Sequence, residues 1–177
     1  MRALRAAALL AALGLLCAPE LPRYRAERRL GLATNAFRTL LGRPADADTA
    51  RNIAAVGEIA AASAGPLPGD PRPWILAGSS WLVTGRPDRA LEDYREAFAD
   101  GERAEIDLNL GRAYSQLQRA ESAHAAYLRA GWVSPEILDA LPPEVKQPLA
   151  AEIATLEREL SSGRLEAPPP LPEQERR

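Results

Sequence analysis

The fold is decided by residues 71–131, which contain one pattern of small and aromatic residues twice. The first copy reads GSSWLVTGRPDRALEDYREA over residues 78–97, and the second reads GRAYSQLQRAESAHAAYLRA over residues 111–130. Five positions match at an offset of 33: Gly78 with Gly111, Trp81 with Tyr114, Ala90 with Ala123, Tyr94 with Tyr127, and Ala97 with Ala130. A period between about 20 and 50 residues indicates a solenoid of stacked helix pairs.

The spacing inside each copy indicates two helices that approach each other closely. In the first copy, small residues and one ring share a face on each helix, namely Ala77, Gly78 and Trp81 on the first helix and Ala90, Tyr94 and Ala97 on the second. Small residues allow two helices to come close together, and the aromatic rings fill the space beside them. The pattern therefore predicts an antiparallel pair of helices, made twice.

These residues resemble the tetratricopeptide repeat, whose pattern runs Trp, Leu-Gly, Tyr, then Ala, Phe or Tyr, Ala and Pro. The signature positions are held by Trp74, Ala77, Gly78, Trp81, Ala90, Tyr94 and Ala97 in the first copy, and by Leu110, Gly111, Tyr114, Ala123, Tyr127, Ala130 and Pro135 in the second. Asp107 stands where the second copy should have a large first residue. The resemblance covers about a third of the chain and implies an all-α, short solenoid of antiparallel helix pairs.

The resemblance also implies a binding surface, because tetratricopeptide proteins line their concave face with fixed positions of each first helix. Those positions hold Arg72, Ile75, Ser79, Leu82, Val83, Glu105, Leu108, Arg112, Ser115 and Gln116. Four of these residues form an apolar strip that Arg72 and Arg112 flank, namely Ile75, Leu82, Val83 and Leu108. Such a strip suits a helix or an extended segment of a partner protein. The alternative is that the chain's own N-terminal helices cover the strip. Binding of chaperone C-terminal carboxylates is rejected, because Ile75 and Ser79 stand where that specificity needs Lys and Asn.

Composition is that of one helical domain. The chain has 177 residues, of which 46% are hydrophobic, and Ala, Leu, Arg and Glu dominate over Val, Ile and Thr. The net charge of −2 hides an asymmetry, since nine arginines face four acidic residues up to Arg51, whereas the remainder carries thirteen basic and twenty acidic residues. An acidic body argues against binding of nucleic acid by the repeats.

Residues 1–21 are expected to be a signal or membrane-anchor segment. Two arginines precede Ala6–Ala18, an apolar run of thirteen residues, which is the length of a signal-peptide core and short of the ~20 residues of a typical membrane span. Leu16 stands where cleavage after Ala18 would need a small residue, so the pattern favours an uncleaved anchor. A cleaved, secreted form and a buried Ala/Leu helix are the alternatives.

The orientation of such an anchor is open. A count of positive charges favours a cytoplasmic body, because the apolar run is followed by Arg23, Arg25, Arg28 and Arg29. The short basic start resembles a bacterial export signal, and we favour export, with the repeats on the periplasmic side. The four arginines suit contact with anionic lipid headgroups or a solvated helix face.

Residues 22–70 are expected to form a degenerate or capping repeat. One amphipathic helix is predicted over residues 25–41. The next should be capped by Asp48 or Thr49 and reach about Ala64, with the inward-facing residues Ile53, Val56, Ile59 and Ala60. Solenoid ends need such variants, because a terminal repeat has one face without a neighbour.

After the repeats at 71–133, residues 134–163 are expected to hold capping helices. Pro142 and Pro143 interrupt this region, and a last helix is predicted to begin between Glu144 and Gln147. The proline-rich tail at 164–177 is expected to be an extended, disordered spacer.

No catalytic residue, cofactor or metal site is predicted. One cysteine excludes an internal disulfide and a thiolate cluster, and the single histidine, His124, falls on the side of its helix away from the repeat signature. Ser79 and Ser80 have no nearby histidine in the sequence pattern, and no glycine-rich phosphate loop occurs. An enzyme with an unrecognised site is the remote alternative.

The sequence as a whole favours a membrane-anchored scaffold that binds another protein, as an adaptor or assembly factor. The alternative is an accessory subunit of a larger membrane complex, which would be unstable when extracted alone. The identity of the partner is not encoded in any motif of the chain.

Overall fold

A computed structural model describes residues 18, 20–99, 101–167 and 169. The described residues form helices and no strand: α2 (Glu20–Leu41), α3 (Ala47–Ala62), α4 (Arg72–Val83), α5 (Pro87–Ala99), α6 (Ala104–Gln116), α7 (Ala120–Val133), the 3₁₀ helix η1 (Pro135–Ala140) and α8 (Pro143–Ser161). The all-α class expected from the sequence is confirmed for this part of the chain. Residues 1–17, which hold most of the expected anchor, and most of the proline-rich tail lie outside the described residues.

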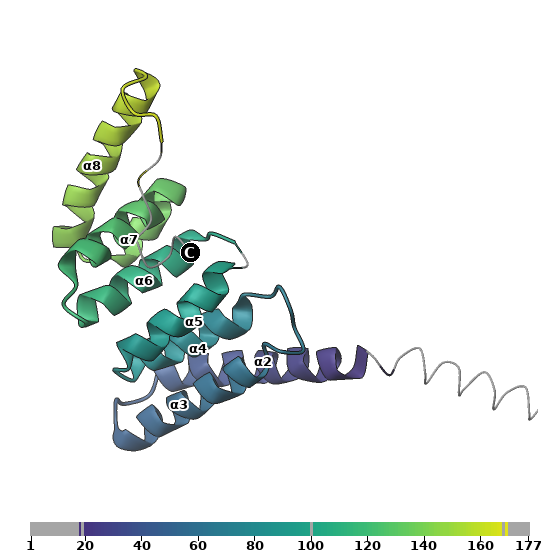
Figure 1. The fold of residues 1–177 in the computed structure, drawn as a ribbon. Coiled ribbons are helices and arrows are strands. Elements are labelled where there is room, and N and C mark those ends of the chain that lie inside the picture. Colours follow the sequence, from purple (N-terminus) through teal and green to yellow (C-terminus); the bar gives the residue numbers. More distant parts are fainter. Residues whose placement is uncertain (1–17, 19, 100, 168, 170–177) are drawn as a thin grey trace, which may run out of the picture.

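Each helix packs against its neighbour in the chain, so the molecule is a stack of successive helix pairs. Figure 1 shows the stack rising from α2 and α3 at the bottom to α8 at the top. α2 also contacts α4, and α4 contacts α6. The first helices of the pairs α2–α3, α4–α5 and α6–α7 therefore form one row.

The core consists of two clusters of buried side chains that meet at α4. Leu76 and Ala77 belong to the cluster formed with α2 and α3, whereas Trp81 and Leu82 belong to the cluster that continues through α5, α6, α7 and α8. A helix that buries side chains on both sides links the two halves of the stack. α4 thus joins the N-terminal pair to the two copies of the repeated pattern.

Within each copy, a glycine on the first helix lies against a tyrosine on the second. A Cβ atom added to Gly78 would lie 2.7 Å from the ring of Tyr94, and one added to Gly111 would lie 2.4 Å from the ring of Tyr127. No side chain larger than hydrogen fits at either position without movement of the ring or the helix. The sequence repeat at an offset of 33 is therefore a repeat of one packing contact.

The turn inside each copy also repeats. Gly85 and Gln118, again 33 residues apart, both have a left-handed backbone, with φ of 71° and 57°. The next residue closes the same hydrogen bond in both turns: Arg86 N donates to Trp81 O at 2.8 Å, and Arg119 N donates to Tyr114 O at 2.9 Å. This is the Schellman type of helix ending, which the second copy makes without glycine.

The signature residues of the two copies are buried, with two exceptions. Trp74 is half-buried and Pro135 is exposed. Asp107, at the position where a large residue was expected, is fully buried in α6. The core therefore tolerates a carboxyl group at that position instead of a ring.

Several helix ends differ from those predicted. α2 begins at Glu20 instead of Arg25, and the carboxylate of Asp46, not Asp48 or Thr49, caps α3 by accepting from Thr49 N at 2.7 Å. Ile59, expected to face inward, is 46% exposed. Propensity places helix ends only to within a few residues, because capping geometry decides the exact position.

The C-terminal region caps the stack. α8 packs against α7, where a Cβ atom on Gly131 would lie 2.6 Å from Ile153. α8 begins at Pro143, ahead of the predicted start, so Pro148 lies past the first turn. Beyond α8, Pro169 is buried and its carbonyl accepts from Arg129 Nη1 at 3.1 Å, so this residue of the expected spacer packs on the body.

None of the helices in the described part of the chain is both long and apolar enough to cross a membrane.

Candidate functional site

A groove of about 480 Å³ runs between α2 and α4 and reaches the start of α6. The residues that line it are Glu27, Leu30, Gly31, Thr34, Asn35 and Phe37 from α2, Arg72, Ile75, Leu76 and Ser79 from α4, and Glu105 from α6. The groove therefore lies along the row made by the first helices of the three pairs.

The floor of the groove is apolar and its rim is polar. Leu30 and Leu76 are buried, whereas Phe37 and Ile75 are half-buried. Asn35 and Glu105 on the rim are exposed and offer an amide and a carboxylate. An apolar floor with a few polar groups around it holds a ligand by burial and orients it by hydrogen bonds.

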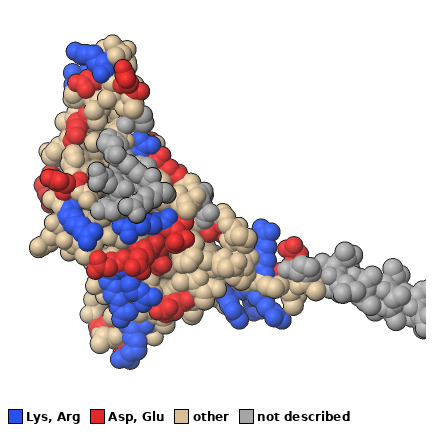
Figure 2. Space-filling model, viewed as in Figure 1, with Lys and Arg blue, Asp and Glu red and all other residues tan. Residues whose placement is uncertain are grey.

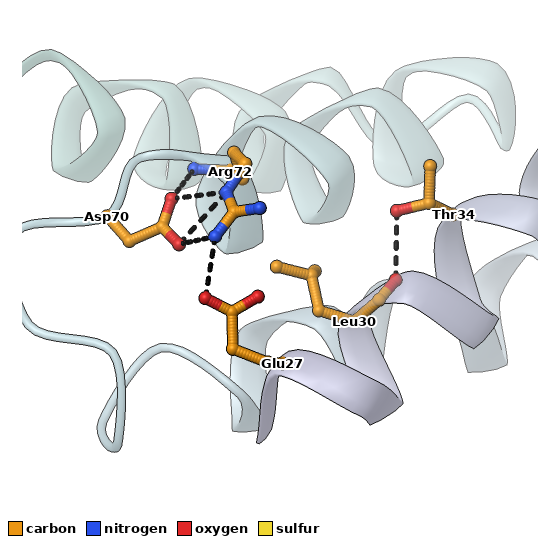
Figure 3. Close-up of polar contacts among 5 residues, drawn as sticks. All are labelled: Glu27, Leu30, Thr34, Asp70 and Arg72. Atoms are coloured by element: carbon orange, nitrogen blue, oxygen red, sulfur yellow. Dashed lines mark hydrogen bonds and ion pairs between the residues drawn. The ribbon is translucent and has the colours of Figure 1, made fainter. Parts of the chain in front are cut away.

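One end of the groove is fixed by Arg72, whose guanidinium lies between two carboxylates (Figure 3). Its Nε donates to Asp70 Oδ1 at 2.9 Å, and its Nη2 donates to Glu27 Oε1 at 2.9 Å. The hydrogen bond from Arg72 lowers the pKa of Asp70, and both carboxylates raise that of Arg72. Because Glu27 is on α2 and Arg72 is on α4, this network ties the two walls of the groove together.

The structure brings together four of the ten residues projected from the family resemblance. Arg72, Ile75, Ser79 and Glu105 all line the groove. Ser79 is half-buried, and its Oγ lies 3.1 Å from the hydroxyl of Tyr94. These four residues come from two different helices, α4 and α6.

The other six projected residues do not line this groove. Leu82 and Leu108 are 8% and 4% exposed and belong to the core, whereas Val83 is 52% exposed. Arg112 donates to Ala140 O at 3.1 Å, so it holds η1 against α6. The last two, Ser115 and Gln116, are exposed at the far end of α6. Gln116 Nε2 donates to Leu82 O at 3.3 Å.

Sequence reasoning missed the wall that α2 contributes. It expected the N-terminal helices either to leave the strip open or to cover it. In the structure α2 does neither, because it lies beside α4 and forms half of the groove. Leu30 and Phe37 belong to the amphipathic helix that was predicted over residues 25–41, but the spacing of its apolar residues does not tell which neighbour they face.

A second hollow of about 320 Å³ lies between α7 and α8. Its lining residues include Ser115, Tyr127, Leu149 and His124. His124 Nε2 lies 2.9 Å from Glu152 Oε2, and the two side chains are 53% and 41% exposed. Within the described ranges, no three His, Cys, Asp or Glu side chains are grouped closely enough to hold a metal ion. The His124–Glu152 contact therefore joins α7 to α8 at the surface.

A carboxyl group with a strongly raised pKa lies outside these two hollows, on α5. Burial raises the pKa of Asp93 to about 6, although the Trp81 indole and Arg89 oppose the shift. Asp93 Oδ2 is buried without a hydrogen-bond partner. Next to it, the guanidinium of Arg89 lies 3.9 Å from the centroid of the Trp81 ring and 3.2 Å from Glu58 on α3. This cluster connects α3, α4 and α5 on the side away from the groove.

Charged side chains cover the visible face of the molecule in alternating patches, and basic ones gather at the projecting end of α2 (Figure 2).

What the fold itself defines is an all-α protein of successive packed helix pairs. Comparison of the chain with models of protein families, with curated proteins and with solved structures found no match in any of the three.

Proposed function

We propose that this protein is a membrane-associated, tetratricopeptide-like adaptor or assembly factor that seats a segment of a partner polypeptide between α2 and α4. The observation that carries the proposal is the groove, which is open, has an apolar floor and is lined by the first helices of all three pairs. The function is protein binding, without chemical change of the partner.

The repeated contacts support the tetratricopeptide likeness. The glycine–tyrosine contact, the left-handed turn residue and the hydrogen bond after it all recur at an offset of 33. In the N-terminal pair, Gly57 on α3 performs a related role, since a Cβ there would lie 3.1 Å from Ser80 and Trp81 on α4. Close packing at small residues thus sets the spacing within the two repeated pairs and between α3 and α4.

The groove suits a short polypeptide segment with one apolar side chain. Leu30, Ile75 and Leu76 would bury that side chain, and burial of apolar surface supplies the main driving force. Asn35 offers hydrogen bonds to a peptide backbone, and the exposed carboxylate of Glu105 favours a basic neighbour in the partner. The partner would therefore combine an apolar residue with a basic one.

The mechanism is presentation of a preformed surface. Arg72 bonds both to Asp70 and to Glu27, and so connects α4 to α2 at one end of the groove. A rigid site lowers the entropy cost of binding, because only the partner has to become ordered. Attachment to the membrane through residues 1–21 would confine this surface to partners at the same bilayer.

Blocking the groove tests the proposal. Gly31 lines the groove and has no atom within 4 Å of an added Cβ, so Gly31→Trp should fill the groove without a clash. Gly65→Trp is the matched control, since Gly65 is equally open but lies outside the groove. Crosslinking in native membranes followed by affinity capture should recover one partner with the wild type and Gly65→Trp and lose it with Gly31→Trp.

Equal capture by both variants would contradict the groove as the binding surface. If the protein instead unfolds when it is extracted from the membrane, whichever variant is used, the accessory-subunit alternative is favoured. Circular dichroism of the purified variants separates loss of capture from loss of fold.

A further inference from the structure

The first turns of α2 carry an exposed apolar stripe on the face opposite the core. Leu21, Tyr24 and Leu32 are 46%, 66% and 62% exposed. At 100° per residue these three positions fall together on one side of α2, whereas the buried Ala26 and Leu30 fall on the other. Figure 1 shows that this end of α2 extends beyond the helices packed on it. The stripe is therefore largely uncovered by the described part of the chain.

Arginines lie within and beside the stripe. Arg25 and Arg28 fall on the same outward side of α2 and Arg29 falls on its flank, whereas Arg23 falls on the side of Leu30; all four are exposed. Within the described part of the chain, none of the four forms an ion pair with a carboxylate. Unpaired arginines around leucine and tyrosine side chains match the two layers of a bilayer surface, phosphate outside and acyl chain beneath.

The position of α2 in the chain points to the same surface. Ala18, the last residue of the apolar run, is three residues before Leu21, and a chain spans at most about 3.6 Å per residue. If the apolar run enters a bilayer, the first turn of α2 is held within about 11 Å of it. The headgroup region of a bilayer has a comparable thickness.

We propose that the outward face of α2 over Leu21–Leu32 lies on anionic lipid headgroups, with Leu21, Tyr24 and Leu32 inserted below the phosphates and Arg25 and Arg28 bound to them. This inference rests on the membrane association included in the proposed function. It adds a second, peripheral contact that fixes how the helix stack stands on the bilayer. The groove then lies beside the membrane-facing side of α2, and a partner close to the bilayer can reach it.

The test uses the full chain with a polarity-sensitive dye at position 24, introduced as Tyr24→Cys in a Cys17→Ser background. Vesicles contain phosphatidylcholine alone or mixed with phosphatidylglycerol, and flotation reports attachment separately from the dye. The inference expects a blue shift of the dye on the mixed vesicles that weakens at high salt. The same dye at Glu96→Cys on α5 should remain in water on both kinds of vesicle.

Arg25→Gln with Arg28→Gln should lower the ratio of docked to undocked α2 about 30-fold, while the protein still floats. The matched control, Arg51→Gln with Arg119→Gln, removes two exposed arginines that lie outside α2 and should leave the shift unchanged. Flotation with a dye that stays in water at position 24 would overturn the headgroup contact alone. Absence of flotation would overturn membrane association as well. A blue shift that needs native membrane proteins would assign the stripe to a protein partner and overturn the inference.

Discussion

Gly111 lies so close to Tyr127 that a Cβ atom on the glycine would be 2.4 Å from two carbons of the tyrosine ring. Gly78 and Tyr94 make the equivalent contact 33 residues earlier, at 2.7 Å. The glycines are needed for space, since both lie inside helices where glycine is otherwise unfavourable. These two contacts set the distance between the helices of each repeated pair.

Gly111→Ala should therefore destabilise the fold by about 1–3 kcal/mol, because the methyl group forces the ring or the helix to move. Urea unfolding followed by circular dichroism measures the loss. Gly31→Ala is the control, since nothing lies within 4 Å of its Cβ and alanine is the better helix former. That control should raise stability by about 0.5–1 kcal/mol. Equal effects of the two substitutions would mean that α6 and α7 are not in close contact at Gly111.

The turns make a second prediction. Gln118 has φ of 57° at the position where the first copy has Gly85. A side chain in the left-handed region costs about 1–2 kcal/mol, part of which is offset because glycine is more flexible in the unfolded chain. Gln118→Gly should thus stabilise the protein by about 0.5 kcal/mol, and Gly85→Gln should destabilise it by about 1 kcal/mol. Thermal unfolding would contradict the shared turn if both changes moved the midpoint in the same direction.

The raised pKa of Asp93 predicts that the stability of the fold depends on pH. Its pKa in the folded protein, about 6, lies above the ordinary value of 3.8, so the folded state binds the proton more tightly than the unfolded state does. The contribution of Asp93 to the free energy of unfolding should therefore fall as the pH rises from about 4 to about 6. Above that range this contribution should stay constant. Asp93→Asn should remove the dependence and raise stability at neutral pH by about 1 kcal/mol, a value reduced for partial solvent screening. The check is urea unfolding of both proteins across this pH range. A difference between them that does not vary with pH would contradict the raised pKa.

The contact of Arg89 with the Trp81 ring is the fourth prediction. Arg89 stacks on the ring at 3.9 Å and pairs with Glu58 of α3, so it connects three helices. Arg89→Ala should cost about 1 kcal/mol, since it removes a cation–π contact and a surface ion pair. Arg51→Ala is the control, because the Arg51–Asp48 pair is exposed and lies within one helix. Its effect on the urea midpoint should be within about 0.5 kcal/mol of zero.

The helical class and the repeated pair could be predicted because they depend on local spacing. Gly78 and Trp81 share one face of the first helix, and Tyr94 lies on one face of the second. The recurrence of this pattern 33 residues later identifies the helix pair without knowledge of the rest of the fold. The ends of the helices were harder to predict from the sequence, as Asp46 shows. Its carboxylate reaches Thr49 N only in the folded turn, while Asp48 offered the same chemistry in the sequence.

The groove could be predicted only in part. Ile75 and Glu105 were found because they belong to the first helices of the repeated pairs. Leu82 and Leu108 were expected on the surface but are buried, since the packing between neighbouring helices covers them. The contribution of α2 depends on a contact between Glu27 and Arg72, 45 residues apart, which no local pattern encodes.

The central claim, that a partner polypeptide lies between α2 and α4, is tested most directly by photo-crosslinking in native membranes. A photoreactive side chain at Asn35 on α2 and one at Glu105 on α6 both line the groove, whereas one at Glu96 on α5 faces solvent elsewhere. The account predicts that Asn35 and Glu105 crosslink to the same partner, that Gly31→Trp abolishes both crosslinks, and that Glu96 gives none. A partner captured from Glu96, and from neither groove position, would contradict it.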